Sequence, residues 1–555
     1  MSKQMKRIFG IDLGTTYSSI AYVDDFGKAV VVPNAENQNV TPSVVFFDGP
    51  NIVVGDVAKE SAKLYPNDVV SFVKRSMGEP DFLFEHDGKS YRAEEISSFV
   101  LRKVAQDAET HLGDKVTDVV ITCPAYFGIN EREATKIAGE IAGFNVRQII
   151  NEPTAAAIAY GTTESSDDKV VLVYDLGGGT FDITMIHIQP EAIEVICTGG
   201  DHNLGGKDWD DRVVATLVEE FHRQTGSKED ILEDPDTCQD LQLSAERSKK
   251  ILSQREKTPI SITHGGERVK VELSREKFDA ITNDLMERTI SLTHAMLGEA
   301  KKKGYSKFDE FILVGGSVRM PMVISRIKEE FGIEPKMFSP EEAVAKGAAI
   351  YGWKLSINDN LIERLQKKIG KKVQINKMED FAKVDAKHVE EVAREVAAET
   401  GYTLPAVKSS MVRVRDVASK SFGVLATNPN NEEVVVNCIL RNTAVPVEVT
   451  QEFYTAVENQ KTVLIRIMES ETSEESVPPE LSREIGTAIL HLPPGLPEDT
   501  PVIISFTLNK EGRLHLTAVE SSEQRKVEVV IETLSVIQGE ELREAKARAQ
   551  NLVVH

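Results

Sequence analysis

The chain has 555 residues, and its 41% hydrophobic and 28% charged residues are typical of globular domains rather than of a disordered chain. Its length predicts about two to four domains. The net charge of −23 argues against a nucleic-acid-binding protein, because such proteins present a basic face to phosphates.

The four cysteines stand apart without a Cys-x-x-Cys spacing, which favours reduced thiols. Residues 1–7 form a short polar lead, and no stretch approaches the ~20 consecutive apolar residues of a membrane span. We therefore expect a cytoplasmic protein with no membrane partner and no nucleic-acid partner.

Residues 8–354 alternate strand-like and helix-like segments, which predicts an α/β fold. The expected strands include residues 44–47, 118–122, 170–174 and 311–314, and the expected helices include residues 131–142 and 323–331. Within this region, Gly10–Tyr17 and Tyr174–Asp182 are variants of one hairpin. The repeat predicts two related lobes, divided near residue 165.

Each hairpin joins an Asp-Leu-Gly entry to a turn rich in glycine and threonine. Glycines let backbone N–H groups approach an anion, and an Asp at a strand end can hold a cation. Two such turns predict two lobes that grip one phosphate chain. An isolated Asp-Leu-Gly is common, so a ligand-free β-turn is the alternative.

A third glycine turn, Gly315-Gly316, follows the strand at 311–314 and precedes a helix that begins near Pro321. A turn at a helix start directs backbone amides and the helix dipole toward an anion or an adenosine. Alone this signal is weak, but it is the third glycine element in one α/β region.

Three polar features have two interpretations each when they are judged by chemistry alone. Glu152 is either a first-turn acid that favours the helix dipole or a site residue, and Lys74 is by default a surface charge. A face shared by Glu246, Lys249, Lys250 and Ser253 is either solvated or holds a ribose and a base. The sequence has no HExxH, GxSxG or GxxxxGK[ST] element, which argues against zinc proteases, serine hydrolases and P-loop enzymes.

The pattern changes after residue 354. Charged amphipathic helices are expected around 361–365 and 389–393, the second ended by Gly401. From about residue 416 the sequence predicts strands, including 502–508 and 514–519 joined by a turn at 509–512. Residues 536–555 predict one short helical tail.

Several of these motifs together resemble the DnaK-type 70-kDa heat-shock chaperone family, within the actin, hexokinase and heat-shock ATPase superfamily. The main ones are IDLGTTYS, NEPTAAAIAYG, DLGGGTFD, LGGKDWD and VGGS. The resemblance implies a two-lobed actin-like ATPase domain at 1–354, with duplicated ribonuclease-H-like lobes, and a β-sandwich peptide-binding domain at 416–533. Residues 355–415 would then be a helical insertion and linker, and residues 534–555 a short tail, the remnant of a truncated lid.

The resemblance also implies a site for ATP or ADP with Mg²⁺, with K⁺ as a further candidate ion. Asp12 and Asp175 would act on magnesium through its waters, and Lys74, Glu152, Thr180 and Asp182 would orient the attacking water and stabilise charge on the γ-phosphate. The remaining nucleotide-binding residues would be Gly14, Thr15, Thr16, Tyr17, Gly177, Gly178, Gly179, Thr180, Glu246, Lys249, Lys250, Ser253, Gly315, Gly316, Ser317, Arg319 and Glu341. Glu341 stands where the family usually has Asp.

In the β domain, the resemblance implies a cleft for an extended apolar polypeptide, lined by Val424, Phe453, Val463 and Ile465. Ordinary sandwich core is the alternative for these four residues.

Three departures from the family pattern bear on mechanism. The linker at Val412–Asp416 carries two arginines where leucines are usual, and unpaired buried charges are costly, so we do not expect it to bury as an apolar linker does. Interdomain coupling would then be weakened or rebuilt through residues 355–411. Gln148 replaces an Arg that usually contacts the J-domain co-chaperone, which puts that partner in doubt. With about twenty residues after the β domain, fast peptide release is expected.

The resulting hypothesis is an ATP-hydrolysing chaperone for unfolded polypeptide, with a nucleotide-exchange factor as a further candidate partner. An ATP-controlled scaffold that binds one folded protein is the alternative. A sugar or metabolite kinase of the superfamily would leave the β domain unexplained.

Overall fold

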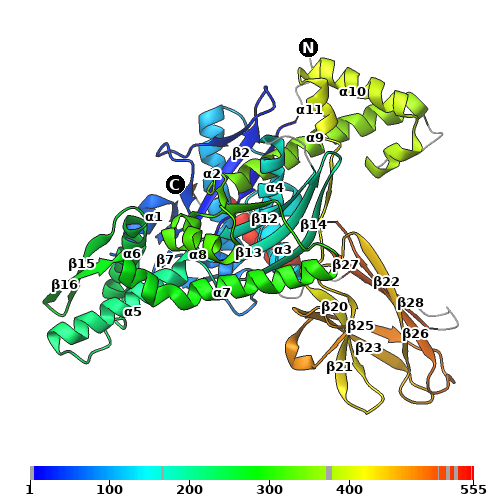
Figure 1. The fold of residues 1–555 in the computed structure, drawn as a ribbon. Coiled ribbons are helices and arrows are strands. Elements are labelled where there is room, and N and C mark those ends of the chain that lie inside the picture. Colours follow the sequence, from blue (N-terminus) through cyan, green and yellow to red (C-terminus); the bar gives the residue numbers. More distant parts are fainter. Residues whose placement is uncertain are drawn as a thin grey trace.

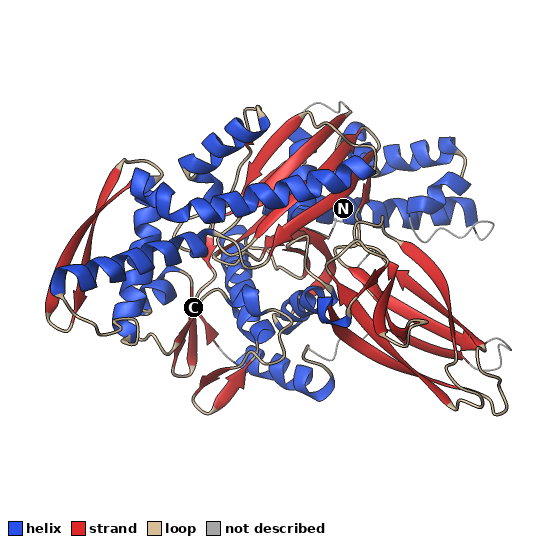
Figure 2. Ribbon diagram, turned by 60° about the horizontal axis from the view of Figure 1, so that its bottom comes forward, coloured by secondary structure: helices blue, strands red, loops and turns tan. Residues whose placement is uncertain are grey.

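The computed structural model describes residues 6–163, 168–370, 378–510, 512–520, 526–530, 536–551 and 553–555. Figure 1 shows a large α/β body from which a helical arm and a β domain project on the same side. In Figure 2 the sheets of the body are flanked by helices, whereas the β domain consists almost entirely of strands. Among the described helices, none combines the length and hydrophobicity that a membrane span requires.

The first lobe is built on a sheet with the order β11-β10-β1-β2-β3, in which β1 runs parallel to β10 and antiparallel to β2. Its strands are β1 (Ile8–Asp12), β2 (Tyr17–Val23), β3 (Ala29–Val32), β10 (Asp118–Cys123) and β11 (Asn145–Asn151). Smaller elements beside it are β4 (Thr41–Pro42), β5 (Val45–Asp48), β6 (Asn51–Val54), α1 (Asp56–Ser61), β7 (Val69–Val70), the 3₁₀ turn η1 (Val73–Ser76), β8 (Phe84–His86) and β9 (Lys89–Tyr91).

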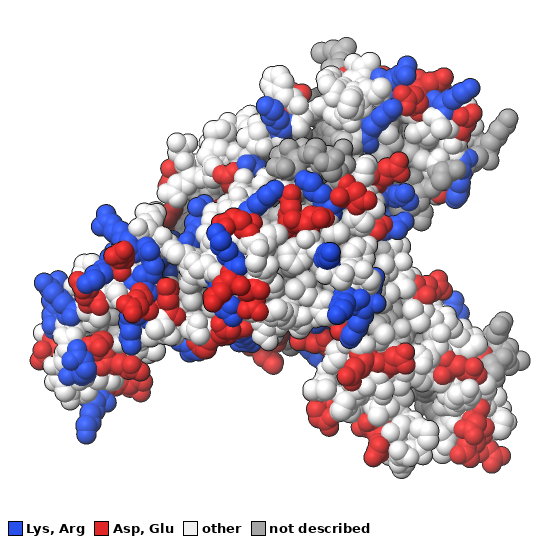
Figure 3. Space-filling model, viewed as in Figure 1, with Lys and Arg blue, Asp and Glu red and all other residues white. Residues whose placement is uncertain are grey.

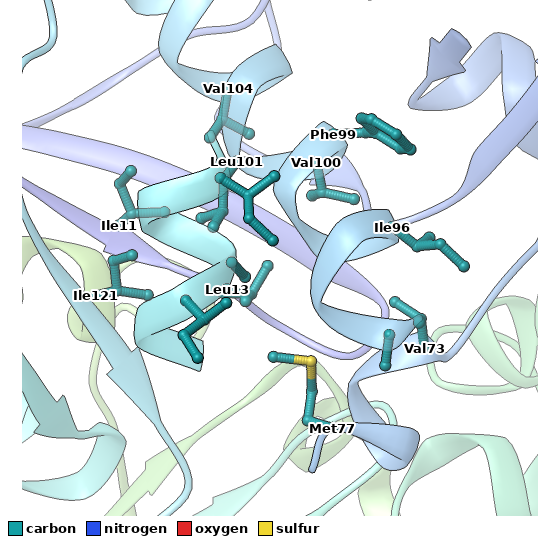
Figure 4. Packing of buried hydrophobic residues seen from close by; sticks show 14 of the residues in the cluster. Ile11, Leu13, Val73, Met77, Ile96, Phe99, Val100, Leu101, Val104 and Ile121 are labelled. Carbon is teal, nitrogen blue, oxygen red and sulfur yellow. The ribbon is translucent and has the colours of Figure 1, made fainter. Parts of the chain in front are cut away.

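Helices cover both faces of this sheet. One face packs against α2 (Ala93–Leu112) and α3 (Ile129–Ile141), and the other against α4 (Glu152–Thr163) and α9 (Ala343–Ile369). Figure 4 shows Ile11 of β1 beside the α2 residues on the first face. Ile8 of the same strand belongs to the core on the second face, as the two-residue period of a strand requires. A sheet buried on both faces holds its strand ends rigidly.

The second lobe repeats this topology with the order β18-β17-β12-β13-β14. Here β12 runs parallel to β17 and antiparallel to β13, so the two glycine-rich hairpins of the sequence are β1–β2 and β12–β13. The strands are β12 (Lys169–Leu176), β13 (Phe181–Gln189), β14 (Ala192–Asp201), β17 (Glu310–Val314) and β18 (Lys336–Met337). The division expected near residue 165 falls outside the described residues.

The second lobe also carries helices and a long hairpin around its sheet. They are α5 (Gly206–Thr225), α6 (Pro235–Leu252), β15 (Lys257–His264), β16 (Glu267–Ser274), α7 (Arg275–Lys302), the 3₁₀ turn η2 (Gly316–Arg319) and α8 (Pro321–Phe331). Pro321 stands at the first position of α8, where its missing N–H has no helical partner to lose.

The helical arm consists of the second half of α9, the 3₁₀ turn η4 (Met378–Lys383), α10 (Ala386–Thr400) and α11 (Leu404–Ser409). The expected boundary between residues 354 and 355 falls inside α9, because buried residues continue at helical spacing to Leu365. Gly401 ends α10 in a left-handed conformation, with φ of 81°. Tyr402 packs edge-on against Trp353, which holds the arm on the body.

The linker forms a short strand, β19 (Arg413–Arg415), which pairs in parallel with β14 of the second lobe. Val414 is half-buried, whereas Arg413 and Arg415 are exposed, and Arg415 forms a 3.0 Å ion pair with Glu194. An edge strand needs only its backbone hydrogen bonds and one apolar side chain to pack. The two charges therefore do not keep this linker from lying on the α/β body.

The β domain contains two packed sheets, with the orders β24-β21-β20-β23-β25 and β22-β26-β27-β28. Their strands are β20 (Ser421–Thr427), β21 (Glu433–Ile439), β22 (Val447–Tyr454), β23 (Thr462–Ser470), β24 (Ser476–Val477), β25 (Ser482–His491), β26 (Pro501–Leu508), β27 (Leu514–Glu520) and β28 (Lys526–Val530), with the 3₁₀ turn η5 (Pro479–Leu481) before β25. The predicted hairpin of residues 502–519 is present as β26–β27. Figure 3 shows clusters of acidic side chains on the visible face of this domain.

The tail does not stay with the β domain. Helix α12 (Gly539–Asn551) and strand β29 (Val553–Val554) lie on the first lobe, where β29 pairs in parallel with β6. Ala545 and Ala549 are buried in the core beside α2 and α3, and Arg548 forms a 2.6 Å ion pair with Glu95. The tail was expected as a short helix. The structure adds a terminal strand and places both elements on the first lobe instead of on the β domain.

Candidate functional site

A cleft between the two lobes has a cavity volume of about 660 Å³. Both glycine-rich hairpins, the Gly315-Gly316 turn and helix α6 contribute to its walls. Of the predicted nucleotide-site residues, the structure places the following in the lining: Asp12, Gly14, Thr15, Thr16, Tyr17, Lys74, Glu152, Asp175, Gly177, Gly178, Thr180, Glu246, Lys249, Lys250, Ser253, Gly315, Gly316, Ser317, Arg319 and Glu341. Gly179 and Asp182 are not among the lining residues of this cavity.

The two hairpin turns face each other at contact distance. A Cβ atom on Gly178 would lie 1.7 Å from the Thr16 hydroxyl oxygen, and one on Gly179 would lie 2.3 Å from the Thr15 methyl carbon. No other residue type leaves room for this approach. Glycine is therefore required at these two positions for the close approach of one lobe to the other.

Lys74 lies at the floor of the cleft, only 3% exposed, and its Nζ is 2.5 Å from a carboxylate oxygen of Glu152. The backbone N–H of Ala125 donates to Asp182 at 3.1 Å, and the Thr122 hydroxyl donates to Asp12 at 3.1 Å. The alternative that Lys74 is a surface charge is wrong, and Glu152 is a buried ion-pair partner rather than only a first-turn acid.

Three acids near Lys74 (Asp12, Asp175 and Asp182) have raised pKa values. Burial, with a contribution from Glu152, raises the pKa of Asp12 to about 7, and Lys74 opposes that rise. Burial also raises the pKa of Asp175 and of Asp182 well above the ordinary value. Burial alone would lower the pKa of Lys74, but Glu152 and Asp12 outweigh it and raise this pKa.

This excess of acids favours a bound cation. Asp12 is the last residue of β1 and Asp175 the second-last residue of β12, so the two lie at similar places in the two lobes, and both line the cleft. A carboxylate oxygen of Asp182 and the Thr16 hydroxyl are buried without a hydrogen-bond partner among the described residues. Within those residues, no group of three His, Cys, Asp or Glu side chains could hold a metal directly. The donor set fits a hydrated Mg²⁺, because that ion usually keeps several of its waters.

The far end of the cleft is bridged by ion pairs between the lobes. Lys59 of α1 lies 2.5 Å from Glu246 of α6, Lys250 lies 2.8 Å from it, and the Tyr17 hydroxyl accepts hydrogen bonds from both lysines. Burial would raise the pKa of Glu246, but the two lysines lower it to about 2. The face at 246–253 is thus part of the cleft wall and not a solvated helix surface.

Lys249 and Arg319 complete this end of the site. Lys249 is 9% exposed and lies 2.6 Å from Asp210, while Arg319 pairs with Glu341 at 3.1 Å. Glu341 therefore lies beside the Gly315-Gly316 turn, although the sequence resemblance would place Asp there.

Sequence reasoning assigned no role to three charged residues of this site. Lys59 reaches Glu246 from the other lobe, Asp210 pairs with Lys249, and Arg75 donates to the Gly179 carbonyl at 2.9 Å. Asp210 and Arg75 belong to motifs that signal the family, so they could have been assigned. Lys59 carries no local signal, because only the fold brings α1 opposite α6.

The predicted peptide-site residues lie in or against the β-domain core. Val424 and Ile465 are 3% and 2% exposed, while Phe453 and Val463 are half-buried and pack against the same core. The burial of Val424 and Ile465 fits both a cleft floor and a sandwich core, so their place in a peptide site stays a prediction. Tyr454, beside Phe453, is 59% exposed.

Gln148 and the end of the linker lie at the contact between the α/β body and the β domain. The Gln148 side chain donates to the Lys510 carbonyl at 3.5 Å, and Asn151 donates to Asp416 at 2.7 Å. Burial raises the pKa of Asp416, and Arg132 opposes this. The position that departs from the family pattern is thus an interdomain contact.

The model of the family described as Hsp70 protein matches residues 8–83, 79–363 and 368–553, which is most of the chain. The chain belongs to the Hsp70 family. A curated Hsp70 relative, the chaperone protein DnaK of Thermosipho melanesiensis, is 45% identical over 358 residues. That alignment covers 63% of this chain and 59% of the relative, so the chain spans under two thirds of the length of the DnaK protein it matches.

Proposed function

We propose that this Hsp70-family chain is an ATP-dependent molecular chaperone. ATP hydrolysis in the two-lobed body, an actin-like domain, would control binding of extended apolar polypeptide by the β domain. The observation that carries the proposal is the pair of facing glycine turns, with Lys74 and Glu152 buried at their base. The family match favours this function over a scaffold for one folded partner.

In this proposal the cleft binds the nucleotide along its length. The turns at Gly14 and at Gly177 would hold the phosphates through backbone N–H groups, and the residues at 246–253 would hold the adenosine. Magnesium would be held through water by Asp12 and Asp175 and would neutralise charge on the phosphates.

The buried cluster would then perform the hydrolysis. Asp182 and Thr180 would orient the attacking water in line with the γ-phosphate, because both lie at the base of the turns. Lys74 would stabilise the negative charge that develops on the phosphoryl oxygens, and Glu152 would hold its ammonium in position. The Asp182 carboxylate, which accepts the Ala125 N–H on one oxygen and has its other oxygen unpartnered among the described residues, would accept a proton from that water.

Coupling to the β domain would run through the linker strand β19. Pairing of β19 with β14 ties the linker to the same strand set that carries Asp175 and Asp182. A change of lobe angle on hydrolysis would strain this pairing and so shift the position of the β domain.

Steady-state ATP hydrolysis, measured with and without a short apolar peptide, tests the proposal. We expect magnesium-dependent hydrolysis that the peptide stimulates, and peptide affinity that differs between ATP and ADP. Hydrolysis without any peptide effect, together with tight binding of a single folded protein, would instead support the scaffold alternative. Stimulation by a J-domain protein would show that Gln148 does not prevent that partnership.

A further inference from the structure

A cavity of about 440 Å³ lies between the catalytic cluster and the β domain. It shares Lys74 and Thr180 with the nucleotide cleft, so these two residues separate the two spaces. Its opposite wall includes Glu469 of strand β23 and Arg483 of β25. The β domain therefore stands one side-chain layer from the proposed hydrolysis site.

Glu469 acts at the start of helix α3, which has no capping side chain of its own. The residue before α3 is Gly128, and the backbone N–H of Ile129 donates to the Glu469 carboxylate at 3.3 Å. A Cβ on Gly128 would lie 2.6 Å from both Glu469 carboxylate oxygens. The helix thus receives its cap from the other domain, and a glycine makes room for it.

The segment before α3 connects this cap to the catalytic cluster. Ala125 donates its N–H to Asp182, and two residues later the carbonyl of Phe127 accepts a 2.8 Å hydrogen bond from the buried Ser419 of the β domain. Ile129 then contacts Glu469. Residues 125–129 therefore touch the catalytic carboxylate at one end and the β domain at the other.

We propose that Glu469 is a proton-responsive positioning residue. It holds the start of α3, and through residues 125–129 it also positions Asp182. Protonation of Glu469 tightens the docking of the β domain on the α/β body. The link to Asp182 rests on the proposed ATPase function, whereas the effect on docking does not.

The charged surroundings of Glu469 explain why a proton matters. Glu131, in the first turn of α3, faces it with a like charge, while Lys420 pairs with Glu471 at 2.6 Å and Arg483 with Glu79 at 3.3 Å. The titratable and charged groups that line the cavity with it are Lys74, Arg75, Glu79, Tyr126, Glu131, His202, Lys420, Glu471, Glu480 and Arg483. Burial and Glu131 raise the pKa of Glu469 to about 7, although Lys420 opposes this.

The direction of the effect follows from this raised pKa. In an undocked β domain Glu469 is hydrated and ionised down to about pH 4.3, whereas in the docked chain it takes up a proton near neutrality. Docking is therefore strongest at acid pH and weakens by up to about tenfold per pH unit as the pH rises toward 7, then levels off. A protonated carboxyl still accepts the Ile129 hydrogen bond through its carbonyl oxygen, so protonation removes the repulsion and keeps the cap.

Energy transfer between fluorophores on the full chain tests the effect on docking. Donor and acceptor are placed at Lys89→Cys in the first lobe and Glu458→Cys in the β domain, both exposed, in a Cys238→Ser background. We expect the docking constant with saturating ATP to fall about tenfold between pH 6 and pH 8. The Glu469→Gln variant keeps the acceptor and loses the charge, so its docking constant should be high and change less than twofold.

Two further variants sharpen the test. Glu131→Gln removes the like charge and should strengthen docking at pH 8, whereas Glu448→Gln, exposed on β22, should behave as the parent chain. A Glu469→Gln variant that keeps the full pH dependence, or a parent chain without any, would overturn the proposal.

Single-turnover ATP hydrolysis tests the link to Asp182. We expect the single-turnover rate of Glu469→Gln, divided by that of the parent chain, to change with pH as the docking constant does. If the two rates have parallel pH profiles, the link from Glu469 to Asp182 is refuted. Absence of hydrolysis in every variant would refute the proposed function and this link together. The fluorescence measurement decides the effect on docking in either case.

Discussion

Lys74→Ala removes the cation that pairs with Glu152 in the floor of the cleft. The Lys74 and Glu152 side chains are 4% and 9% exposed, so their charges are poorly screened by water. Loss of one group that stabilises transition-state charge costs about 10²–10³-fold in rate, or about 2.7–4 kcal/mol. We therefore expect hydrolysis to fall by about that factor. ADP affinity should change less than about fivefold, because the glycine turns and the 246–253 face are intact.

The same substitution should lower stability in a pH-dependent way. Breaking a buried ion pair costs about 3–5 kcal/mol when the remaining charge stays ionised. The pKa values of Asp12 and Asp182 are already raised, so the cluster can take up a proton instead. The loss in free energy of unfolding should therefore be smaller at pH 6 than at pH 8.

The assay compares single-turnover hydrolysis, ADP binding by calorimetry and urea unfolding at both pH values. Lys301→Ala, an exposed lysine of α7, is the matched control and should leave all three unchanged. Hydrolysis within about threefold of the parent chain would refute the role of Lys74. A loss of ADP binding as large as the loss of rate would show a structural effect instead.

Three further changes have outcomes fixed by local geometry. Gly179→Ala should weaken ADP binding, measured by calorimetry, more than tenfold, because its Cβ would lie 2.3 Å from Thr15. The control Gly298→Ala has open space in a helix, so it should raise the free energy of unfolding by about 0.5–1 kcal/mol. Glu246→Gln should destabilise the chain at pH 7, because Lys59 and Lys250 stabilise the ionised Glu246 and lower its pKa to about 2. Protonation of Glu246 removes this stabilisation, so the difference in free energy of unfolding between variant and parent, measured by denaturant titration, should vanish as the pH falls from about 4.5 toward 2. The amide of Val54 donates to the His555 carbonyl at 3.0 Å, so Ala549→Asp, which disrupts the buried face of α12, should make this amide exchange faster with solvent hydrogen. Gln550→Asp changes an exposed neighbour and should leave the exchange unchanged. Equal protection of the Val54 amide in both variants would contradict the packing of α12.

Much of the cleft could be predicted because its requirements are local. A turn that brings backbone N–H groups close to an anion needs glycine wherever a Cβ would collide, and Gly178 and Gly179 meet that condition against the threonines of the other hairpin. Helix limits followed the same logic at Pro321 and Gly401, where one residue sets the backbone conformation.

Other features depended on segments far apart in the chain. Chemistry alone favoured a surface position for Lys74, whose burial depends on Glu152 some 78 residues away. Val424 and Ile465 share the alternating pattern of a cleft wall and of a core, and their burial depends on strands that come much later in the chain. The linker arginines predicted a linker that does not bury as an apolar one does, and only the fold shows that it pairs along β14 with both arginines exposed.

The sequence by itself therefore determined the two hairpins, the chemistry of their turns and the separation of an α/β region from a β region, because glycine, proline and hydrophobic periodicity act within a few residues. Only the tertiary structure decided that Lys59 closes the cleft, that the tail joins β6 and that Glu469 caps α3 from another domain. Each of those contacts joins residues far apart in the chain, and its strength depends on the burial and neighbouring charges that the complete fold creates.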